Sequence, residues 1–410
     1  MESAVFISGM AWVDPATVLP LFITHLGGST LLVGLVTVLQ RLGYMLPQLP
    51  MAAVLGHRPR RAPVLRWGVL IGRLPMMAFV IYLWVAGIQR EGFVLAFMLF
   101  AYFSTAAGNG VVALPWQDII AKSIPSGIRG KFFASMQFTT ALMTVGVGFA
   151  VRWFLGGNGP SFPLNYTLLF TLMAMFFTLS IIGCWMMREP IRPVLDSPQS
   201  IPDIVRGAIP VFRENRAFRC LVLTGVLGSS LTFTTPFYMV YAKVKLHVPD
   251  GMAGVYILAM TVSSASFAWI WGRLNDRRGP QSAVRGACTM LTAAPLLALL
   301  VPATMRGLGP VLHYAMAVVF VAAGAATSGM FMGLMNYLFE LSGHEDRPRY
   351  IAMMNLLTAP GAFAPALIGL LLEHLPFPTV FGLVALCAGA ALAAAWRMPA
   401  LPAHGPSPAA

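Results

Sequence analysis

Two opposite charges interrupt the first apolar stretches of this chain. Asp14 lies near the middle of a run that starts at the N-terminus, and Arg41 lies near the middle of the next run. A charge at membrane depth is costly and usually marks a functional position. These residues predict a proton-binding carboxylate whose pairing with Arg41 changes during a transport cycle. The alternative is a permanent ion pair that only fixes helix packing.

The long apolar stretches that carry these charges predict membrane-spanning helices. Apolar residues make up 58% of the 410-residue chain and charged residues only 10%, whereas soluble domains carry about 25% charged residues. The runs are continuous rather than alternating, which favours helices of roughly 20 residues over barrel strands. We expect twelve spans, at residues 3–25, 29–53, 65–87, 92–115, 132–155, 165–187, 218–241, 252–272, 282–304, 309–338, 350–373 and 379–397.

The longest polar stretch separates the sixth span from the seventh. It predicts a cytoplasmic linker at residues 188–217 between six-helix bundles at 1–187 and 218–397. A disordered cytoplasmic tail is expected at 398–410. An even number of spans places both termini on the same side.

Basic residues are distributed unevenly between the two sides. Of the 27 lysines and arginines, five lie in the loops of one side, two lie inside spans, and the remaining twenty lie on the side of the termini. Positive charge concentrates in cytoplasmic loops, so we expect a multi-pass protein of the plasma or inner membrane with both termini cytoplasmic. The net charge of +13 then reflects topology in a lipid bilayer, and no nucleic-acid partner is expected.

The two halves contain matching loops. The Arg-Arg pair at 60–61 recurs at 277–278, and the segment Arg129–Gln137 resembles Arg347–Asn355, at offsets of 217 and 218. Two matches at nearly the same offset, in equivalent loops, predict a duplicated six-helix unit in parallel orientation.

A motif follows the eighth span, where Gly272, Leu274, Asp276, Arg277 and Gly279 spell Gly-x-Leu-x-Asp-Arg-x-Gly. This loop resembles the signature loop of the major facilitator superfamily. The resemblance covers essentially the whole chain and implies an all-α membrane fold of twelve helices, arranged as two six-helix halves about a pseudo-twofold axis.

The chain departs from the superfamily pattern in two places. In the first copy of the loop, Pro59 stands where the aspartate would align, and Ala62 replaces the second glycine. The fifth span lacks the Gly-Pro pair that is associated with proton-coupled drug exporters of the superfamily.

Basic residues of these loops can reach acids at the cytoplasmic ends of neighbouring spans. Such ion pairs would hold the cytoplasmic side shut and break on opening, with the glycines forming a tight turn and Asp276 capping a neighbouring helix. The alternative is that the arginines only set topology. The predicted gate residues are Arg60, Arg61, Asp118, Arg129, Gly272, Asp276, Arg277, Arg278, Gly279, Glu340 and Arg347.

Other polar side chains inside the spans could line a substrate cavity. The candidates are Gln40, Asn109, Gln137, Tyr238, Asn336 and Asn355. Interhelical hydrogen bonding is the alternative for the amides, and interface anchoring is the alternative for the tyrosine. Arg73, about six residues into the third span, is expected to reach the cytoplasmic surface by snorkelling.

Together these features predict a secondary active transporter that moves a small organic solute by alternating access, with the solute bound near the midplane. The low charge of the spans and their many Met and Phe residues favour an amphipathic solute, and proton coupling is a hypothesis. We find no Walker loop, HExxH motif or nucleophile elbow, so no enzyme, cofactor or metal is expected. The protein is expected to act as a monomer. The alternative is a non-transporting membrane protein of the same fold, such as an assembly factor, lipid handler or receptor.

Overall fold

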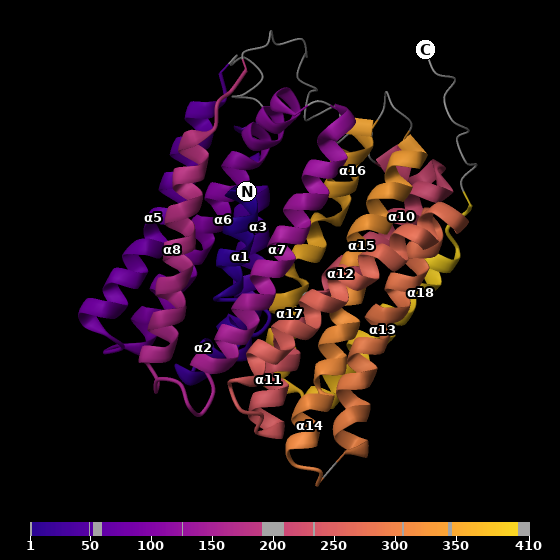
Figure 1. The fold of residues 1–410 in the computed structure, drawn as a ribbon. Helices are drawn as coiled ribbons and strands as arrows, with labels where there is room; N and C mark the ends of the chain where they lie inside the picture. Colours follow the sequence, from indigo (N-terminus) through magenta and orange to yellow (C-terminus); the bar gives the residue numbers. More distant parts are fainter. Residues whose placement is uncertain are drawn as a thin grey trace. The chain divides into compact units, whose positions relative to one another are not determined.

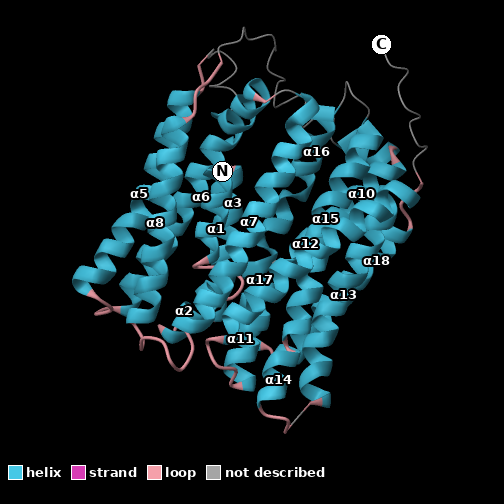
Figure 2. Ribbon diagram, in the orientation of Figure 1, coloured by secondary structure: helices cyan, strands magenta, loops and turns pink. Residues whose placement is uncertain are grey.

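The structure is a computed structural model that describes residues 2–48, 50–51, 60–124, 126–190, 209–232, 234–305, 307–342 and 347–400. All regular elements in these ranges are helices, and Figure 2 shows no strand among them. Nine helices of the described chain are long and apolar enough to cross a membrane, and α3 is a shorter apolar helix. The all-α membrane architecture is confirmed, and the count of twelve spans stays a prediction.

The chain forms two compact units. The first comprises Met1–Pro198 with Met239–Leu258, and the second comprises Gln199–Tyr238 with Ala259–Ala410. The segment 239–258, which the apolar pattern assigned to the second half, therefore packs in the first unit. The predicted limits of the linker and tail fall largely on residues outside those described, and they stay predictions.

The first unit contains the helices drawn from indigo to magenta in Figure 1. They are α1 (Glu2–Ala11), α2 (Val18–His25), α3 (Thr30–Met45), α5 (Ala62–Ala86), α6 (Glu91–Ser123), α7 (Ser126–Phe154) and α8 (Leu164–Met186). Helix α1 packs on α7 and α8, α5 packs on α6 and α8, and α3 packs on α6.

The remaining helices follow from residue 216 onward. They are α10 (Arg216–Thr232), α11 (Thr235–Leu246), α12 (Met252–Arg278), α13 (Pro280–Thr304), α14 (Pro310–Ala315), α15 (Ala317–Ser342), α16 (Arg347–Thr358), the 3₁₀ helix η1 (Ala359–Phe363), α17 (Ala364–His374) and α18 (Phe377–Trp396). In the second unit α10 packs on α16 and α18, and α13 packs on α15 and α18. This repeats the pairing of α1 with α7 and α8 and of α5 with α6 and α8, as a duplicated six-helix unit requires.

Two predicted spans are interrupted at prolines, because proline removes a backbone donor and clashes with the preceding turn. Pro15 lies in the break between α1 and α2, and Pro360 lies in η1 between α16 and α17. Helix α3 ends at Met45, before the expected end of the second span, and residues 52–59 lie outside those described.

Aromatic packing fixes the short helix α2 in the first unit. The ring of Phe22 lies 5.3 Å from that of Phe170, and Phe170 lies 5.1 Å from Phe79. All three side chains are fully buried. This anchor sets the position of His25, which ends α2 three residues later.

Candidate functional site

The break in the first predicted span is organised by Asp14. Its Oδ1 accepts hydrogen bonds from the Ala16 N–H and the Thr17 hydroxyl, both at 2.9 Å. Its backbone carbonyl accepts from the Val18 N–H at 3.0 Å. The Asp14 carboxylate thus stabilises the turn that precedes α2, and its backbone carbonyl satisfies the first amide of that helix, which lacks a partner inside the helix.

Three buried polar atoms of the first unit have no hydrogen-bond partner in the described chain: Trp12 Nε1, Thr37 Oγ1 and Tyr102 Oη. The Tyr102 ring is buried, and its hydroxyl lies within electrostatic range of the Asp14 carboxylate. Buried polar atoms are nearly always hydrogen-bonded. These three are therefore candidates to bind a solute or ordered water.

The structure does not bring Asp14 and Arg41 into an ion pair. The carboxylate of Asp14 is engaged by its own turn, and Arg41 is partly buried on α3. Their pairing at another step of a transport cycle stays a prediction.

The predicted cavity residues fall into different environments. Gln40 and Asn109 are partly buried on the packed helices α3 and α6, whereas Gln137 on α7 and Asn355 on α16 are exposed in the isolated chain. Gln137 and Asn355 occupy equivalent positions in the two copies of the repeat, and both are exposed. The assignment of these four residues to a cavity stays a prediction.

Tyr238 and Asn336 have partners inside the second unit. The buried ring of Tyr238 packs edge-on against Phe381, with ring centroids 5.1 Å apart. The Asn336 side-chain amide donates to Asn275 Oδ1 at 3.3 Å. Asn336 therefore contacts the motif that joins α12 to α13.

Charged residues cluster at one end of the first unit. Arg61 lies 3.1 Å from Asp118, and Lys122 lies 2.5 Å from Asp118 and 3.5 Å from Glu189. The Glu189 carboxylate also accepts the backbone N–H groups of Arg61 and Ala62, each at 2.8 Å. We call Arg61, Asp118, Lys122 and Glu189 the first-loop cluster.

Sequence reasoning selected Arg61 and Asp118 but missed Glu189 and Lys122. Glu189 satisfies the free amides at the start of α5, where the helix dipole favours a negative charge. The available signal was an acid directly after the sixth predicted span, which has to end close to the start of the third in an up-and-down bundle.

The motif of the second unit is organised differently. Helix α12 continues to Arg278, and Gly279 joins it directly to α13 with a φ of 82°, a conformation that favours glycine. Gly272 lies inside α12, so the expected tight turn needs glycine only at 279. The Asp276 carboxylate accepts from Asn275 Nδ2 at 3.3 Å, and the expected cap on a neighbouring helix stays a prediction.

Arg277 and Arg278 are exposed, and no ion pair within the described residues includes them. Glu340 lies in the last turn of α15. Among the other predicted gate residues, Arg60 is exposed, and the side chains of Arg129 and Arg347 lie outside the described part. Their role in a gate stays a prediction.

A second repeated feature was invisible in the sequence. In the first unit, Arg66 donates to the Met187 carbonyl at 3.2 Å and lies over the Trp185 ring. Both contacts lie at the end of α8, where carbonyls lack helical partners and the dipole favours a cation.

The second unit repeats this arrangement with more bonds. Arg285 donates to the carbonyls of Ala395, Trp396 and Met398 at 3.2, 3.4 and 3.0 Å. Its guanidinium lies 4.9 Å from the Trp396 ring centroid. The C-termini of α8 in the first unit and of α18 in the second are therefore each capped by an arginine that stacks on a tryptophan.

Arg73 does not reach a surface by snorkelling. Its side chain is 3% exposed, lies 3.5 Å from Glu2 and is stacked 4.6 Å from the Phe6 ring centroid. Glu2 also accepts a short hydrogen bond from the Ser180 hydroxyl. The acid near the N-terminus compensates the buried guanidinium, and sequence distance concealed this partner.

A partly open cavity of about 290 Å³ lies beside Glu2 in the first unit. It is lined mainly by apolar residues: Glu2, Ser3, Trp116, Ile120, Phe132, Met136, Gly183, Met186 and Met187.

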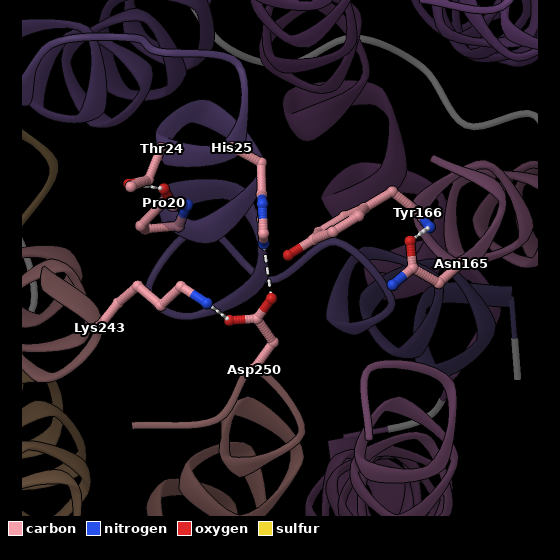
Figure 3. Close-up of polar contacts among 7 residues, drawn as sticks. All are labelled: Pro20, Thr24, His25, Asn165, Tyr166, Lys243 and Asp250. Atoms are coloured by element: carbon pink, nitrogen blue, oxygen red, sulfur yellow. Dashed lines mark hydrogen bonds and ion pairs between the residues drawn. The ribbon is translucent and has the colours of Figure 1, made fainter. Parts of the chain in front are cut away.

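At the end of α2, three charged or titratable side chains meet (Figure 3). His25 Nε2 lies 2.5 Å from Asp250 Oδ2, and the Lys243 ammonium contacts the other carboxylate oxygen. The His25 ring stacks on Phe162 and meets Tyr166 edge-on, at centroid distances of 5.1 and 5.7 Å. We call His25, Lys243 and Asp250 the histidine node.

Known proteins support the assignment of the fold. A sequence profile described as Major Facilitator Superfamily matches residues 2–314 and 239–410. This chain belongs to the major facilitator superfamily. A comparison with curated protein sequences found no match.

Solved structures of transporters share the superfamily fold with this chain. A mutant of the nucleoside transporter NupG has a TM-score of 0.72 at 12% identity, covering 97% of this chain and 98% of that one. A D-xylose–proton symporter has a TM-score of 0.68 at 14% identity, covering 98% and 97%. A POT family transporter in complex with 5-aminolevulinic acid has a TM-score of 0.66 at 13% identity, covering 96% and 93%.

Membership of the superfamily assigns the chain to a transporter family and not to a class of enzymes. The superfamily motif at 272–279 is the helix connection described above, stabilised by Asn275 and Gly279. The low identities to solved members show the fold alone, so the solute has to be argued from this chain's own residues.

Proposed function

We propose that this superfamily member is a secondary active transporter that moves a small organic solute across the plasma or inner membrane by alternating access. In this proposal twelve spans form two halves, at residues 1–187 and 218–397, with both termini cytoplasmic. The solute binds near the midplane and the protein acts as a monomer. No cofactor takes part.

The observation that carries the proposal is the interrupted first span. The Asp14 carboxylate stabilises the turn between the two segments of this span, and the hydroxyl of Tyr102 is buried without a partner in the described chain. In transporters, broken helices place free helix ends and polar groups at the binding site. A purely structural membrane protein gains nothing from such orphaned groups, which cost about 1–3 kcal/mol each.

The class of solute follows from the few charges in the spans. Tyr102, Trp12 and Thr37 supply hydroxyl and indole groups rather than formal charges, which suits a neutral or amphipathic molecule. Three solved structures of similar fold are named for small organic solutes, namely a nucleoside, D-xylose and 5-aminolevulinic acid, and two others are named for iron or a metal. The fold therefore accommodates small organic solutes, and the preference for one rests on the residues of this chain.

Proton coupling through Asp14 is part of the proposal. A carboxylate that stabilises a turn within a span can exchange its hydrogen bonds for a proton, and Arg41 can compensate its charge when the turn opens. The first-loop cluster would hold the start of α5 against the end of α6 and Glu189 during this step, because its ion pairs can break and re-form.

Transport by protein reconstituted in liposomes tests the proposal. A panel of labelled nucleosides, sugars, amino acids and amphipathic amines would be measured with and without a pH gradient, in the wild type and in Asp14→Asn. Asparagine keeps the Oδ1 acceptor that bonds Ala16 and Thr17 in this turn, so this variant should stay folded. We expect wild-type flux that depends on the gradient, and loss of that dependence in Asp14→Asn.

The variant Asp14→Ala serves as the matched structural control. It removes the hydrogen bonds of the turn as well as the charge, and we expect it to lower the unfolding free energy by about 1 kcal/mol. Gradient-driven flux that persists in Asp14→Asn would exclude coupling through Asp14. A folded wild type that moves no member of the panel would favour the non-transporting alternative.

A further inference from the structure

The histidine node lies apart from every residue used in the proposed function. Asp250 receives His25 from the end of α2 and Lys243 from α11 (Figure 3). The three side chains are partly buried, with 28% of His25, 28% of Lys243 and 14% of Asp250 exposed. Removal from water strengthens a charge-assisted hydrogen bond.

Aromatic rings hold the imidazole in place. Phe162 stacks on one face of His25 at an interplanar angle of 21°, and Tyr166 meets it at 63°. The two rings hold His25 in the rotamer that meets Asp250. The imidazole therefore loses little conformational freedom when it binds the carboxylate.

The segment that carries Lys243 and Asp250 is otherwise held by close backbone packing. A Cβ on Gly254 would collide with the Gly148 carbonyl oxygen, and a Cβ on Gly251 would lie 2.9 Å from Gly156 Cα. These glycines let segment 239–258 approach α7 backbone to backbone. Close backbone packing of this kind supplies dispersion contacts. The node adds a polar contact that fixes segment 239–258 against α2.

We propose that His25 is a proton-binding site that latches segment 239–258 to α2, within the first unit, when protonated and loosens it when neutral. In the protonated form both ring nitrogens donate, and His25 and Lys243 together neutralise and exceed the charge of Asp250. In the neutral form the Coulomb attraction between imidazole and carboxylate is lost, and Lys243 alone compensates Asp250.

Asp250 itself does not titrate in the range where histidine does. Burial raises the pKa of the Asp250 carboxyl, but hydrogen bonds from His25 and Lys243 and their charges outweigh it and leave the pKa below its usual value of 3.8. Because the folded pKa is depressed, its contribution to stability is present above about pH 4 and is lost as the pH falls through the folded value. It is constant between pH 5.5 and 8.5.

Four other titratable groups face the node or lie close to it. Lys243 and Tyr166 are the groups that face it from α11 and α8, and Glu91 lies near Gly27 just beyond α2. Arg152 lies on α7 against Gly254. Lysine, arginine, tyrosine and glutamate titrate outside pH 5.5–8.5 in their ordinary environments, whereas histidine changes charge between pH 5 and 8.

The test uses a reporter cysteine in the purified full chain. Val248 lies between Lys243 and Asp250 in the chain and is 1% exposed, so the thiol of Val248→Cys should react with a soluble maleimide only when the segment loosens. Cys387, the exposed native cysteine, is replaced by serine. Rates are divided by those of Lys245→Cys, an exposed position on the same segment, which removes the pH dependence of the thiol reaction.

We expect the normalised Val248→Cys rate to rise about fivefold from pH 5.5 to 8.5. A charge-assisted hydrogen bond is about twice as strong as a neutral one, and the loss of half of the bond's strength makes the loosened segment about five times more populated. His25→Gln should react at the high rate at every pH. His247→Gln, a histidine of the same segment without a described partner, should keep the wild-type profile. A flat wild-type profile, or a rise that survives in His25→Gln, would overturn the proposal.

A second readout covers the case in which the reporter variant fails to fold. Hydrogen exchange of segment 239–258, corrected for the intrinsic pH dependence, should lose protection between pH 6 and 8 in the wild type and not in His25→Gln. Equal loss in both proteins would again overturn the latch. Neither readout requires solute flux, so a chain with this profile that moves no solute would refute the proposed function alone.

Discussion

The two units carry corresponding helix connections and stabilise them by different chemistry. In the first, Asp118 of α6 binds Arg61 and Lys122 as ion pairs. In the second, Asn336 of α15 bonds the Asn275 amide. Asp118 and Asn336 are 218 residues apart, and so are Lys122 and Glu340, which matches the offset of the sequence repeat.

The difference shows that the duplication kept the position of the contact and changed its chemistry. The connection that matches the superfamily motif has its acid, Asp276, and both arginines exposed to solvent. The connection that departs from the motif, with Pro59 in place of that acid, makes the ion pairs instead. Glu189, outside the repeat, supplies the negative charge that the first loop lacks.

The arginine caps reverse this difference, because here the second unit makes more polar contacts than the first. Arg285 bonds three carbonyls at the end of α18, whereas Arg66 bonds one at the end of α8. Of these two sites, the first unit therefore makes more polar contacts at the loop before α5, whereas the second makes more at the end of α18.

The largest expected effect is on Glu189. Glu189→Ala removes an acceptor from two backbone amides and a partner from Lys122, in a side chain that is only 5% exposed. We expect a loss of about 2 kcal/mol in unfolding free energy, measured by denaturant titration in detergent. Glu189→Gln keeps an acceptor oxygen and should lose about half as much. A loss below about 0.5 kcal/mol, the scatter of surface substitutions, would contradict the capping role.

The arginine caps give the next effect and test the opposite asymmetry. Arg285→Ala should lower the unfolding free energy by about 2 kcal/mol and Arg66→Ala by about 1 kcal/mol, because the former strands more carbonyls. The same titration measures both. Equal losses would mean that stacking on tryptophan, which both arginines share, outweighs the hydrogen bonds.

Neutralising the acid of the first-loop cluster should have a smaller effect. Asp118→Asn keeps the shape of the side chain but removes its charge from Arg61 and Lys122, which are 20% and 12% exposed. We expect a loss of about 1 kcal/mol at low salt that shrinks as ionic strength rises. A loss that ignores salt would indicate a hydrogen bond and not an ion pair.

The reciprocal change in the second unit should be the smallest. Asn336→Asp places a carboxylate one helical turn before Glu340, where like charges destabilise a helix by about 0.5 kcal/mol. Because the penalty needs both charges, it should vanish when the pH falls below about 4. An increase in stability near neutral pH would show that an exposed arginine of the motif already lies within reach of residue 336.

The helices and part of the first-loop cluster could be predicted from the sequence. Apolar runs define helices because a span must satisfy its backbone internally, and Arg61 and Asp118 were selected from a basic loop and an acid at a helix end. Glu189 could have been found by asking which acid meets the free amides of the third span. The repeat predicted the fold but gave no sign that Asn336 would replace an acid.

Contacts between distant segments could not be predicted. His25 and Asp250 are 225 residues apart, and Arg73 meets Glu2 across 71 residues, so no periodicity relates either pair. The break at Asp14 was indicated by Pro15. The bonds of the Asp14 carboxylate to Ala16 and Thr17 depended on the conformation of the turn, which the residue types alone do not determine.

A pair of double-mutant cycles tests most directly whether the first unit uses ionic and the second unit neutral contacts. One cycle combines Arg61→Ala with Asp118→Ala, and the other combines Asn275→Ala with Asn336→Ala, each measured as coupling in unfolding free energy at low and high salt. We predict a coupling of about 1 kcal/mol for the first pair that falls by about half at 1 M salt, and about 0.5 kcal/mol for the second that stays constant. No coupling in the first pair, or a salt-dependent coupling in the second, would contradict the account.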